Sequence, residues 1–183
     1  MQVRRFLALL GMLAVVQAAP ALAALKVGAT APLFKAQASL GGKVYEFDLA
    51  SALKKGPVVL YFYPAAFTPG CTIEAHDFAA AIGEYRALHA TVIGVSHDTI
   101  GVLNKFSVSA CRSKFPVAAD PHLTVAKAYD AVLPIDPRYA NRTSYVIAPD
   151  GKIAYTYTSL NPSKHVANTL AAVKALERKP AGN

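Results

Sequence analysis

The sequence has only two cysteines, Cys71 and Cys111, among its 183 residues. Glu74 stands three positions after Cys71, so the chain lacks a Cys-x-x-Cys motif. This absence argues against a disulfide oxidoreductase, because those enzymes use two cysteines at that spacing. Two cysteines forty residues apart leave a structural disulfide and a redox pair open, and composition does not choose between them.

The sequence also lacks the spacing that is typical of a metal site. Its five histidines show no ligand spacing with one another or with the cysteines, so we expect no metal. Nineteen Lys and Arg against eleven Asp and Glu give a formal net charge of +8. The basic residues are scattered and do not alternate with aromatic ones, so we expect no nucleic-acid binding.

A long hydrophobic run is missing except at the N-terminus. There, Arg4 and Arg5 precede the apolar residues 6–16, and Ala21-Leu22-Ala23 follows. This order predicts an export signal peptide, residues 1–23, that is cleaved after Ala23. We expect general secretion rather than the twin-arginine route.

The apolar run is shorter than the roughly 20 residues that a spanning helix needs. We therefore expect no stable membrane association after cleavage, and a periplasmic or secreted protein. Residues 24–183 would then form a single domain with a sizeable core.

Residues 57–63 are apolar at every position, as expected of a central strand that is covered on both faces. The chain as a whole predicts an α/β fold, with a central mixed sheet and helices on both faces. The predicted strands are 34–38, 44–48, 57–63, 91–96, 115–119, 142–147 and 153–158. The predicted helices are 49–53, 68–88, 99–108, 123–129 and a terminal helix that starts at Pro162.

Two local assignments follow from side-chain patterns. In the helix 68–88, Ile73 falls on the apolar stripe, whereas Glu74 falls among residues that can face water. Ser96-His97-Asp98 contains the residue types of a hydrolase triad, but three successive residues cannot converge on one point. We interpret this segment as a strand-to-helix connection with Asp98 as the N-cap.

Cys71 lies where the apolar strand runs through a Pro-rich turn into the helix 68–88. A thiol in the first helical turn meets unpaired backbone N–H groups and the positive end of the helix dipole, which favour the reactive thiolate. Thr68 lies three residues earlier, so its hydroxyl can reach the sulfur or the oxygen that the sulfur attacks. Pro64 and Pro69 stiffen this turn. The pattern predicts a nucleophilic cysteine.

These residues resemble the peroxiredoxins, whose signature Pro-x-x-x-Thr-x-x-Cys is matched by Pro64, Thr68 and Cys71. The longer segment 67–75, Phe-Thr-Pro-Gly-Cys-Thr-Ile-Glu-Ala, is similar to the Q-type branch, also called bacterioferritin comigratory proteins. Segments 27–34 and 141–147 extend the resemblance to about residues 26–177. It implies a thioredoxin-like fold with peroxiredoxin additions.

The resemblance implies roles for further residues. Arg142 is the expected cation, because a guanidinium stays charged and offers several donors. Glu74 often pairs with this arginine in the family, although it could equally complement the helix dipole. Cys111 is the expected resolving cysteine, since it lies after the next helix, where some Q-type members carry one. The other common family position, five residues after Cys71, holds His76.

The implied reaction is reduction of hydrogen peroxide and small organic hydroperoxides, with Cys71 passing through a sulfenic acid. Cys111 would resolve it, and a thioredoxin-like protein would supply the electrons, without heme, flavin or metal. We expect a monomer, with a weak dimer as the alternative. The rival hypothesis is a non-catalytic thioredoxin-fold protein that carries a static Cys71–Cys111 disulfide.

Overall fold

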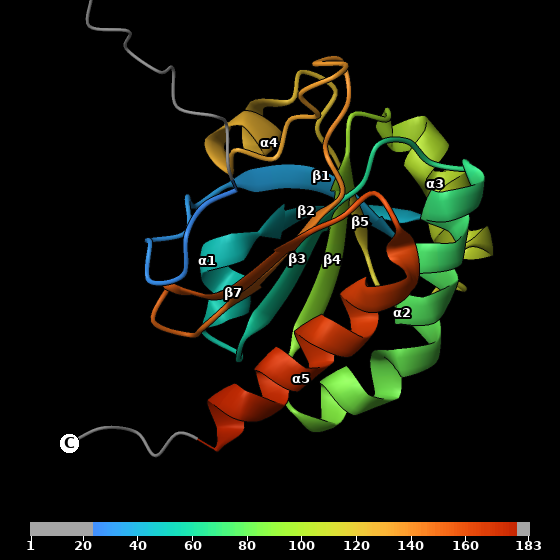
Figure 1. Ribbon diagram of the computed structural model, residues 1–183. Helices are drawn as coiled ribbons and strands as arrows, with labels where there is room; N and C mark the ends of the chain where they lie inside the picture. The colour runs from blue at the N-terminus through green and yellow to red at the C-terminus, as the bar shows by residue number, and fades with distance from the viewer. Residues whose placement is uncertain (1–23, 179–183) are drawn as a thin grey trace, which may run out of the picture.

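The fully apolar segment of the sequence forms the strand β3 (Val58–Phe62), which is buried at every position. In the computed structural model, which describes residues 24–178, β3 lies inside a seven-stranded sheet (Figure 1). It pairs in parallel with β4 (Thr91–Ser96) and antiparallel with β6 (Thr143–Ile147). A strand with neighbours on both sides and both faces covered favours apolar side chains along its whole length.

The sheet has the order β2-β1-β5-β4-β3-β6-β7. The predicted hairpins are present as β1 (Lys35–Leu40) with β2 (Lys43–Asp48), and as β6 with β7 (Ile153–Thr158). The short strand β5 (Val117–Ala119) pairs in parallel with β4 and antiparallel with β1. The sheet is therefore mixed, as predicted.

Helices cover both faces of this sheet (Figure 1). The short helices α1 (Leu49–Leu53) and α4 (Thr124–Ala128) contribute to one hydrophobic core. The longer helices α2 (Pro69–Ala87), α3 (Ile100–Ser109) and α5 (His165–Glu177) contribute to the other. Side chains of β3 alternate between the two cores, because successive residues of a strand point to opposite faces. The prediction of helices on both faces is confirmed.

The core on the α2 side contains several stacked aromatic rings. Tyr61 lies with its ring centroid 4.4 Å from that of Phe78 and 5.4 Å from that of Tyr63. Gly94 is the β4 partner of Tyr61, and a Cβ there would come within 2.6 Å of the Tyr61 ring. The absence of a side chain at Gly94 therefore lets the phenol lie flat across the sheet.

Two predictions about α2 are wrong. Ile73, expected on the buried stripe of α2, is 51% exposed, whereas Glu74, expected toward water, is fully buried. The reason is that α5 packs beside α2, so the buried face of α2 is rotated toward the sheet and α5 together. The terminal helical segment starts at Pro162 as predicted, although its first turn (Pro162–Lys164) is 3₁₀ and runs directly into the α-helix α5, which starts at His165.

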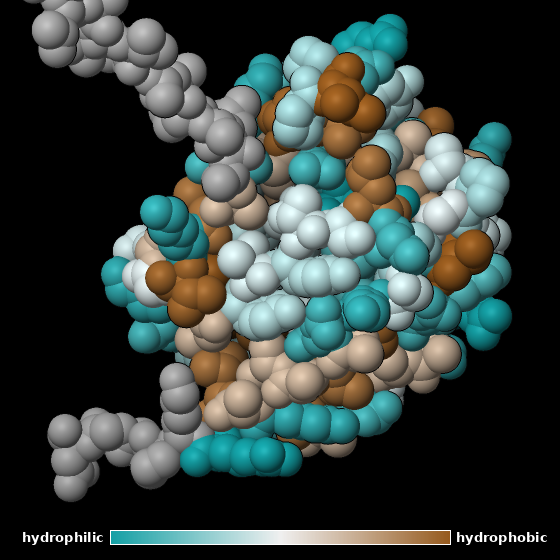
Figure 2. Space-filling view, viewed as in Figure 1, coloured by the Kyte–Doolittle hydropathy of each residue, from teal (hydrophilic) through white to brown (hydrophobic). Residues whose placement is uncertain are grey.

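The predicted signal peptide, residues 1–23, lies outside the described residues. Within residues 24–178, none of the helices is both long enough and apolar enough to span a bilayer. On the face shown in Figure 2, exposed hydrophobic residues form small groups separated by hydrophilic ones.

Candidate active site

The turn between β3 and α2 holds Cys71 as the sequence predicts. Thr68 is the N-cap residue, α2 begins at Pro69, and Cys71 is therefore in its first turn. Phe67 has a positive φ of 64°, a left-handed conformation that is uncommon for a residue with a side chain. The Thr68 hydroxyl donates to Ala65 O at 3.0 Å, so it braces the turn rather than capping the helix. Cys71 is 2% exposed, so its sulfur lies just below the surface.

Arg142 lies against this sulfur. Its Nη2 is 3.4 Å from Cys71 Sγ, and its Nε donates to Leu160 O at 2.9 Å. Arg142 precedes β6, whose first residue pairs with the last residue of β3, so sheet register brings the guanidinium to the start of α2. A Cβ at Gly70 would lie 3.2 Å from Nη2, which makes this position tight for any larger residue.

Glu74 is the second partner of Arg142. One turn after Cys71 on the same face of α2, its Oε2 accepts from Arg142 Nη1, and both side chains are buried. Burial raises the pKa of Glu74 to about 8, and the opposing attraction of Arg142 moderates that rise. Burial acts against the charge of Arg142 too, but Glu74 and Cys71 raise the pKa of the guanidinium above its usual range. The pairing favoured by the family resemblance is therefore present.

His165, at the start of α5, extends this polar cluster and was missed by the sequence analysis. It is fully buried, and its Nδ1 lies 2.8 Å from Ser144 Oγ and 3.6 Å from Glu74 Oε1. Its Nε2 lies 2.9 Å from Ser159 O. Burial lowers the pKa of His165 to about 4. The sequence gave no signal for a role of His165, because none of the five histidines has the spacing of metal ligands.

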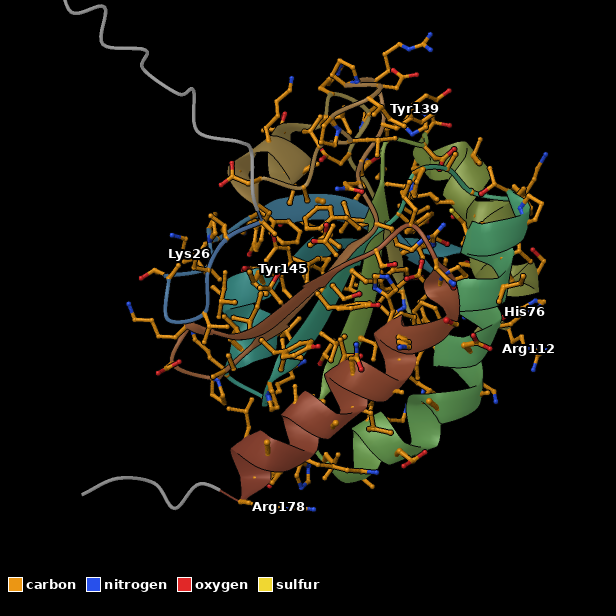
Figure 3. The ribbon with its side chains drawn as sticks, viewed as in Figure 1. Lys26, His76, Arg112, Tyr139, Tyr145 and Arg178 are labelled. Carbon is orange, nitrogen blue, oxygen red and sulfur yellow. The ribbon has the colours of Figure 1, made fainter. Side chains whose placement is uncertain are left out.

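Ser96-His97-Asp98 supports the active-site turn from the neighbouring strand. His97 Nδ1 is 2.8 Å from Pro64 O, and the Asp98 carboxylate accepts from Ala66 N at 2.7 Å. The predicted N-cap role of Asp98 is wrong, because Thr99 occupies that position in α3 and Asp98 turns toward the Cys71 turn. The His97 ring meets Tyr139 edge-on, with centroids 4.7 Å apart, in the connection between α4 and β6 (Figure 3).

Cys111 follows α3, as predicted, and lies in the same core as Cys71. It is fully buried, and burial raises the pKa of its thiol well above the usual range. Both cysteines are free thiols. Arg112 and Ser113, which follow Cys111, have positive φ values of 51° and 55°. Two successive left-handed residues make a tight reversal of the chain directly after the thiol.

The five predicted residues Pro64, Thr68, Cys71, Glu74 and Arg142 thus converge at one end of β3. Cys111, two residues after the end of α3, lies in the same hydrophobic core as Cys71. His76 is half-buried on the outer side of α2 (Figure 3). Among residues 24–178, no group of three or more His, Cys, Asp and Glu side chains is placed to hold a metal ion.

Comparison with known proteins identifies the family. The AhpC/TSA family matches residues 27–156. The chain is 34% identical over 127 residues to the chloroplastic peroxiredoxin Q of Triticum aestivum, covering 69% of this chain and 58% of the relative. It is 30% identical over 124 residues to the peroxiredoxin Bcp of Xanthomonas campestris pv. campestris, covering 64% of this chain and 76% of the relative.

A solved structure agrees with these relatives. The crystal structure of peroxidoxin BcpB from Mycobacterium tuberculosis matches with a TM-score of 0.75 at 31% identity, covering 83% of this chain and 98% of that one. The seven-stranded sheet and its helices therefore form the thioredoxin-like fold of the peroxiredoxins. With the threonine and cysteine of the signature in one turn and Arg142 against the sulfur, the chain belongs to the AhpC/TSA family, in the Bcp or Q-type branch of the peroxiredoxins.

Proposed function

We propose that this thiol peroxidase reduces hydrogen peroxide and small organic hydroperoxides with Cys71 as its nucleophile. The observation that carries the assignment is the position of Cys71 in the first turn of α2 with Arg142 Nη2 3.4 Å from its sulfur. Backbone N–H groups and a fixed guanidinium both favour negative charge on the sulfur and on an oxygen bound beside it.

The chemical step uses these same groups. The Cys71 thiolate attacks one peroxide oxygen, the O–O bond breaks, and the departing alkoxide or hydroxide takes a proton to become an alcohol or water. The sulfur becomes a sulfenic acid, Cys–SOH. Arg142 and the amides of α2 stabilise the charge that moves from sulfur to the leaving oxygen. The Thr68 hydroxyl, at the rim of the turn, orients the peroxide.

Cys111 is proposed as the resolving thiol. Its thiol condenses with the Cys71 sulfenic acid to give a disulfide and water, and a thioredoxin-like protein then reduces that disulfide by thiol exchange. Both thiols are buried, one in the first turn of α2 and the other just after α3, and a disulfide needs Cα atoms within about 7 Å and Cβ vectors that face each other. We therefore propose that the first turn of α2 and residues 107–113 open locally in each cycle.

The protein is further proposed to act outside the cytoplasm, as a periplasmic or secreted monomer. The export part of this proposal rests on the order of basic, apolar and small residues in positions 1–23. Mass measurement of the protein recovered from the exported fraction tests it, with a first residue of Ala24 expected. A protein that keeps residues 1–23 would contradict the export proposal and leave the peroxidase proposal intact.

The test of the redox pair uses reduced protein and one equivalent of peroxide. Peptide mass mapping is expected to find a Cys71–Cys111 bond within one chain, with faster amide exchange at the start of α2 and in 107–113. A stable sulfenic acid at Cys71 with Cys111 free would instead show resolution by an outside thiol. A disulfide that persists under a thioredoxin-like reductant, with no peroxide consumed, would favour the static-disulfide hypothesis.

A further inference from the structure

The segment that contains Cys111 is held together by a hydrogen bond between its two ends. Ser107 O accepts from Ser113 N at 2.8 Å, and the chain turns back between them through the left-handed residues Arg112 and Ser113. Within this segment Cys111 is fully buried, although Arg112 and Ser113 directly after it are exposed. A local opening of residues 107–113 is therefore enough to expose the thiol.

The hydroxyl of Ser107 ties this segment to the hairpin of β1 and β2. It lies 2.9 Å from Ser39 Oγ on β1, and it accepts from Gly42 N, in the hairpin turn, at 3.0 Å. It also donates to Asn104 O, one turn earlier in α3, at 3.2 Å. A serine hydroxyl has one donor and two acceptor sites, so with its proton on Asn104 O it accepts from Ser39 and Gly42 together. Every hydrogen-bonding site of this buried hydroxyl is then used.

The turn of the hairpin also lies directly against this segment. A Cβ at Gly41 would come within 3.2 Å of Ser113 Cβ, and a Cβ at Gly42 would come within 3.2 Å of Val108 Cγ2. Both glycines have positive φ, 57° and 79°, so the turn needs residues without a side chain for its conformation as well as for this close approach. The turn therefore contacts residues 107–113 on both sides of Cys111.

A second tie to this part of the chain comes from α2, where Arg86 Nη2 donates to Lys114 O at 2.7 Å. This bond is exposed, so water can replace it when the segment opens. The bond between Ser107 and Ser39 differs, because both side chains are fully buried and the Ser39 hydroxyl bonds only Ser107 among residues 24–178. The buried tie therefore contributes more to keeping the segment closed.

We propose that Ser107 is a positioning residue for the resolving step: its hydroxyl fastens residues 107–113 to the β1–β2 turn and sets how often Cys111 is released to meet the sulfenic acid of Cys71. On release, the Cys111 sulfur bonds to the Cys71 sulfur, the S–O bond breaks, and the hydroxyl leaves with the thiol proton as water. The inference rests on the proposed resolving role of Cys111.

Alkylation of Cys111 by iodoacetamide measures this release in reduced protein, without peroxide. Ser107→Ala leaves the buried Ser39 hydroxyl without a partner in the closed form, so the alkylation rate is expected to rise about tenfold. Ser39→Ala breaks the same bond from β1 but leaves Ser107 its other two bonds, so a rise of about threefold is expected. The double variant is expected to fall below Ser107→Ala alone, because no buried hydroxyl is left unpartnered.

Ser109→Ala is the matched control. Ser109 lies on the same helix and donates to Lys105 O at 2.9 Å, but it is exposed and its hydroxyl makes no bond to the hairpin. Its substitution is expected to keep the wild-type alkylation rate. With one equivalent of peroxide, Ser107→Ala is expected to form the Cys71–Cys111 bond about tenfold faster, while the sulfenic acid forms at the wild-type rate.

An unchanged alkylation rate of Cys111 in Ser107→Ala, or an equal rise in Ser109→Ala, would overturn the inference. Faster alkylation of Cys71 and Cys111 alike would reduce the effect to a loss of global stability. Faster alkylation with an unchanged rate of disulfide formation would remove the tie from the resolving step. If Ser107→Ala fails to fold, Ser39→Ala decides. A wild-type protein that consumes no peroxide contradicts the proposed function instead, and the alkylation rates can still be compared.

Discussion

Cys71 and Cys111 are both buried in the same hydrophobic core, yet their surroundings differ. Cys71 lies in the first turn of a helix, where free N–H groups and Arg142 favour a negative sulfur. Cys111 lies after the end of α3, among apolar side chains, and burial raises the pKa of its thiol. In the proposed mechanism the neighbours of each thiol, and not its depth, make Cys71 rather than Cys111 the nucleophile.

The largest expected effect separates the two thiols directly. Cys71→Ser is expected to abolish peroxide consumption, because a hydroxyl is not ionised in this position at neutral pH. Cys111→Ser is expected to leave the first oxidation of Cys71 at the wild-type rate and to stop turnover with the protein reductant. Single-turnover and steady-state peroxide loss measure the two steps. Peroxide consumption by Cys71→Ser would remove the enzymatic role of this site.

The next largest effect is expected from substitution of Arg142, the residue that distinguishes the surroundings of Cys71 from those of Cys111. Arg142→Ala is expected to slow peroxide reduction by about 10²- to 10³-fold, as for loss of a donor that stabilises developing charge. Arg142→Lys keeps the charge but cannot hold Leu160 O, Glu74 and the sulfur together, so only part of the rate returns. Rates at fixed pH in folded variants measure this. Equal rates for wild type and Arg142→Ala would contradict the role of the guanidinium.

A smaller effect is expected when the alkylation rates of the two thiols are compared in the absence of peroxide. In reduced, folded protein, iodoacetamide is expected to label Cys71 at least about tenfold faster than Cys111, because the thiolate is the reacting form. In urea the two rates should converge, since the helix start and the core are both lost. Peptide mass spectrometry over time gives both rates in one sample. Faster labelling of Cys111 in the folded protein would reverse the comparison.

The smallest effect concerns stability and pH. The folded pKa of Glu74, about 8, lies above the unfolded value, so the native state holds a proton that the unfolded state releases. Glu74 therefore makes stability fall as pH rises from about 4.5 to 8. His165, with a folded pKa of about 4, makes stability rise between about pH 4 and 6.5. In Glu74→Gln the fall of stability between about pH 4.5 and 8 is expected to vanish. Denaturation at several pH values measures the stability of wild type and variant. Glu84→Gln, on the exposed face of α2, is the control.

Contiguous patterns allowed the main elements to be predicted from sequence. The apolar run before Pro64 could only be a strand covered on both faces, and the helix after it had to begin near Cys71. The site around Cys71 was therefore located by residues that are neighbours in the chain. Its family signature was also contiguous, and the comparisons show the family that this signature suggested.

The sequence by itself thus determined the strand, the turn, the helix and the cysteine at their junction, because adjacent residues and short-range periodicity carry that information. Only the tertiary structure decided which face of α2 is buried, since that depends on where α5 packs. It also decided that Glu74 and Arg142, 68 residues apart, form a buried pair and that His165 lies beside it, with Nδ1 3.6 Å from Glu74 Oε1. A charged residue in a helical pattern is read as solvent-facing, and only the partner that folding brings to it makes its burial possible.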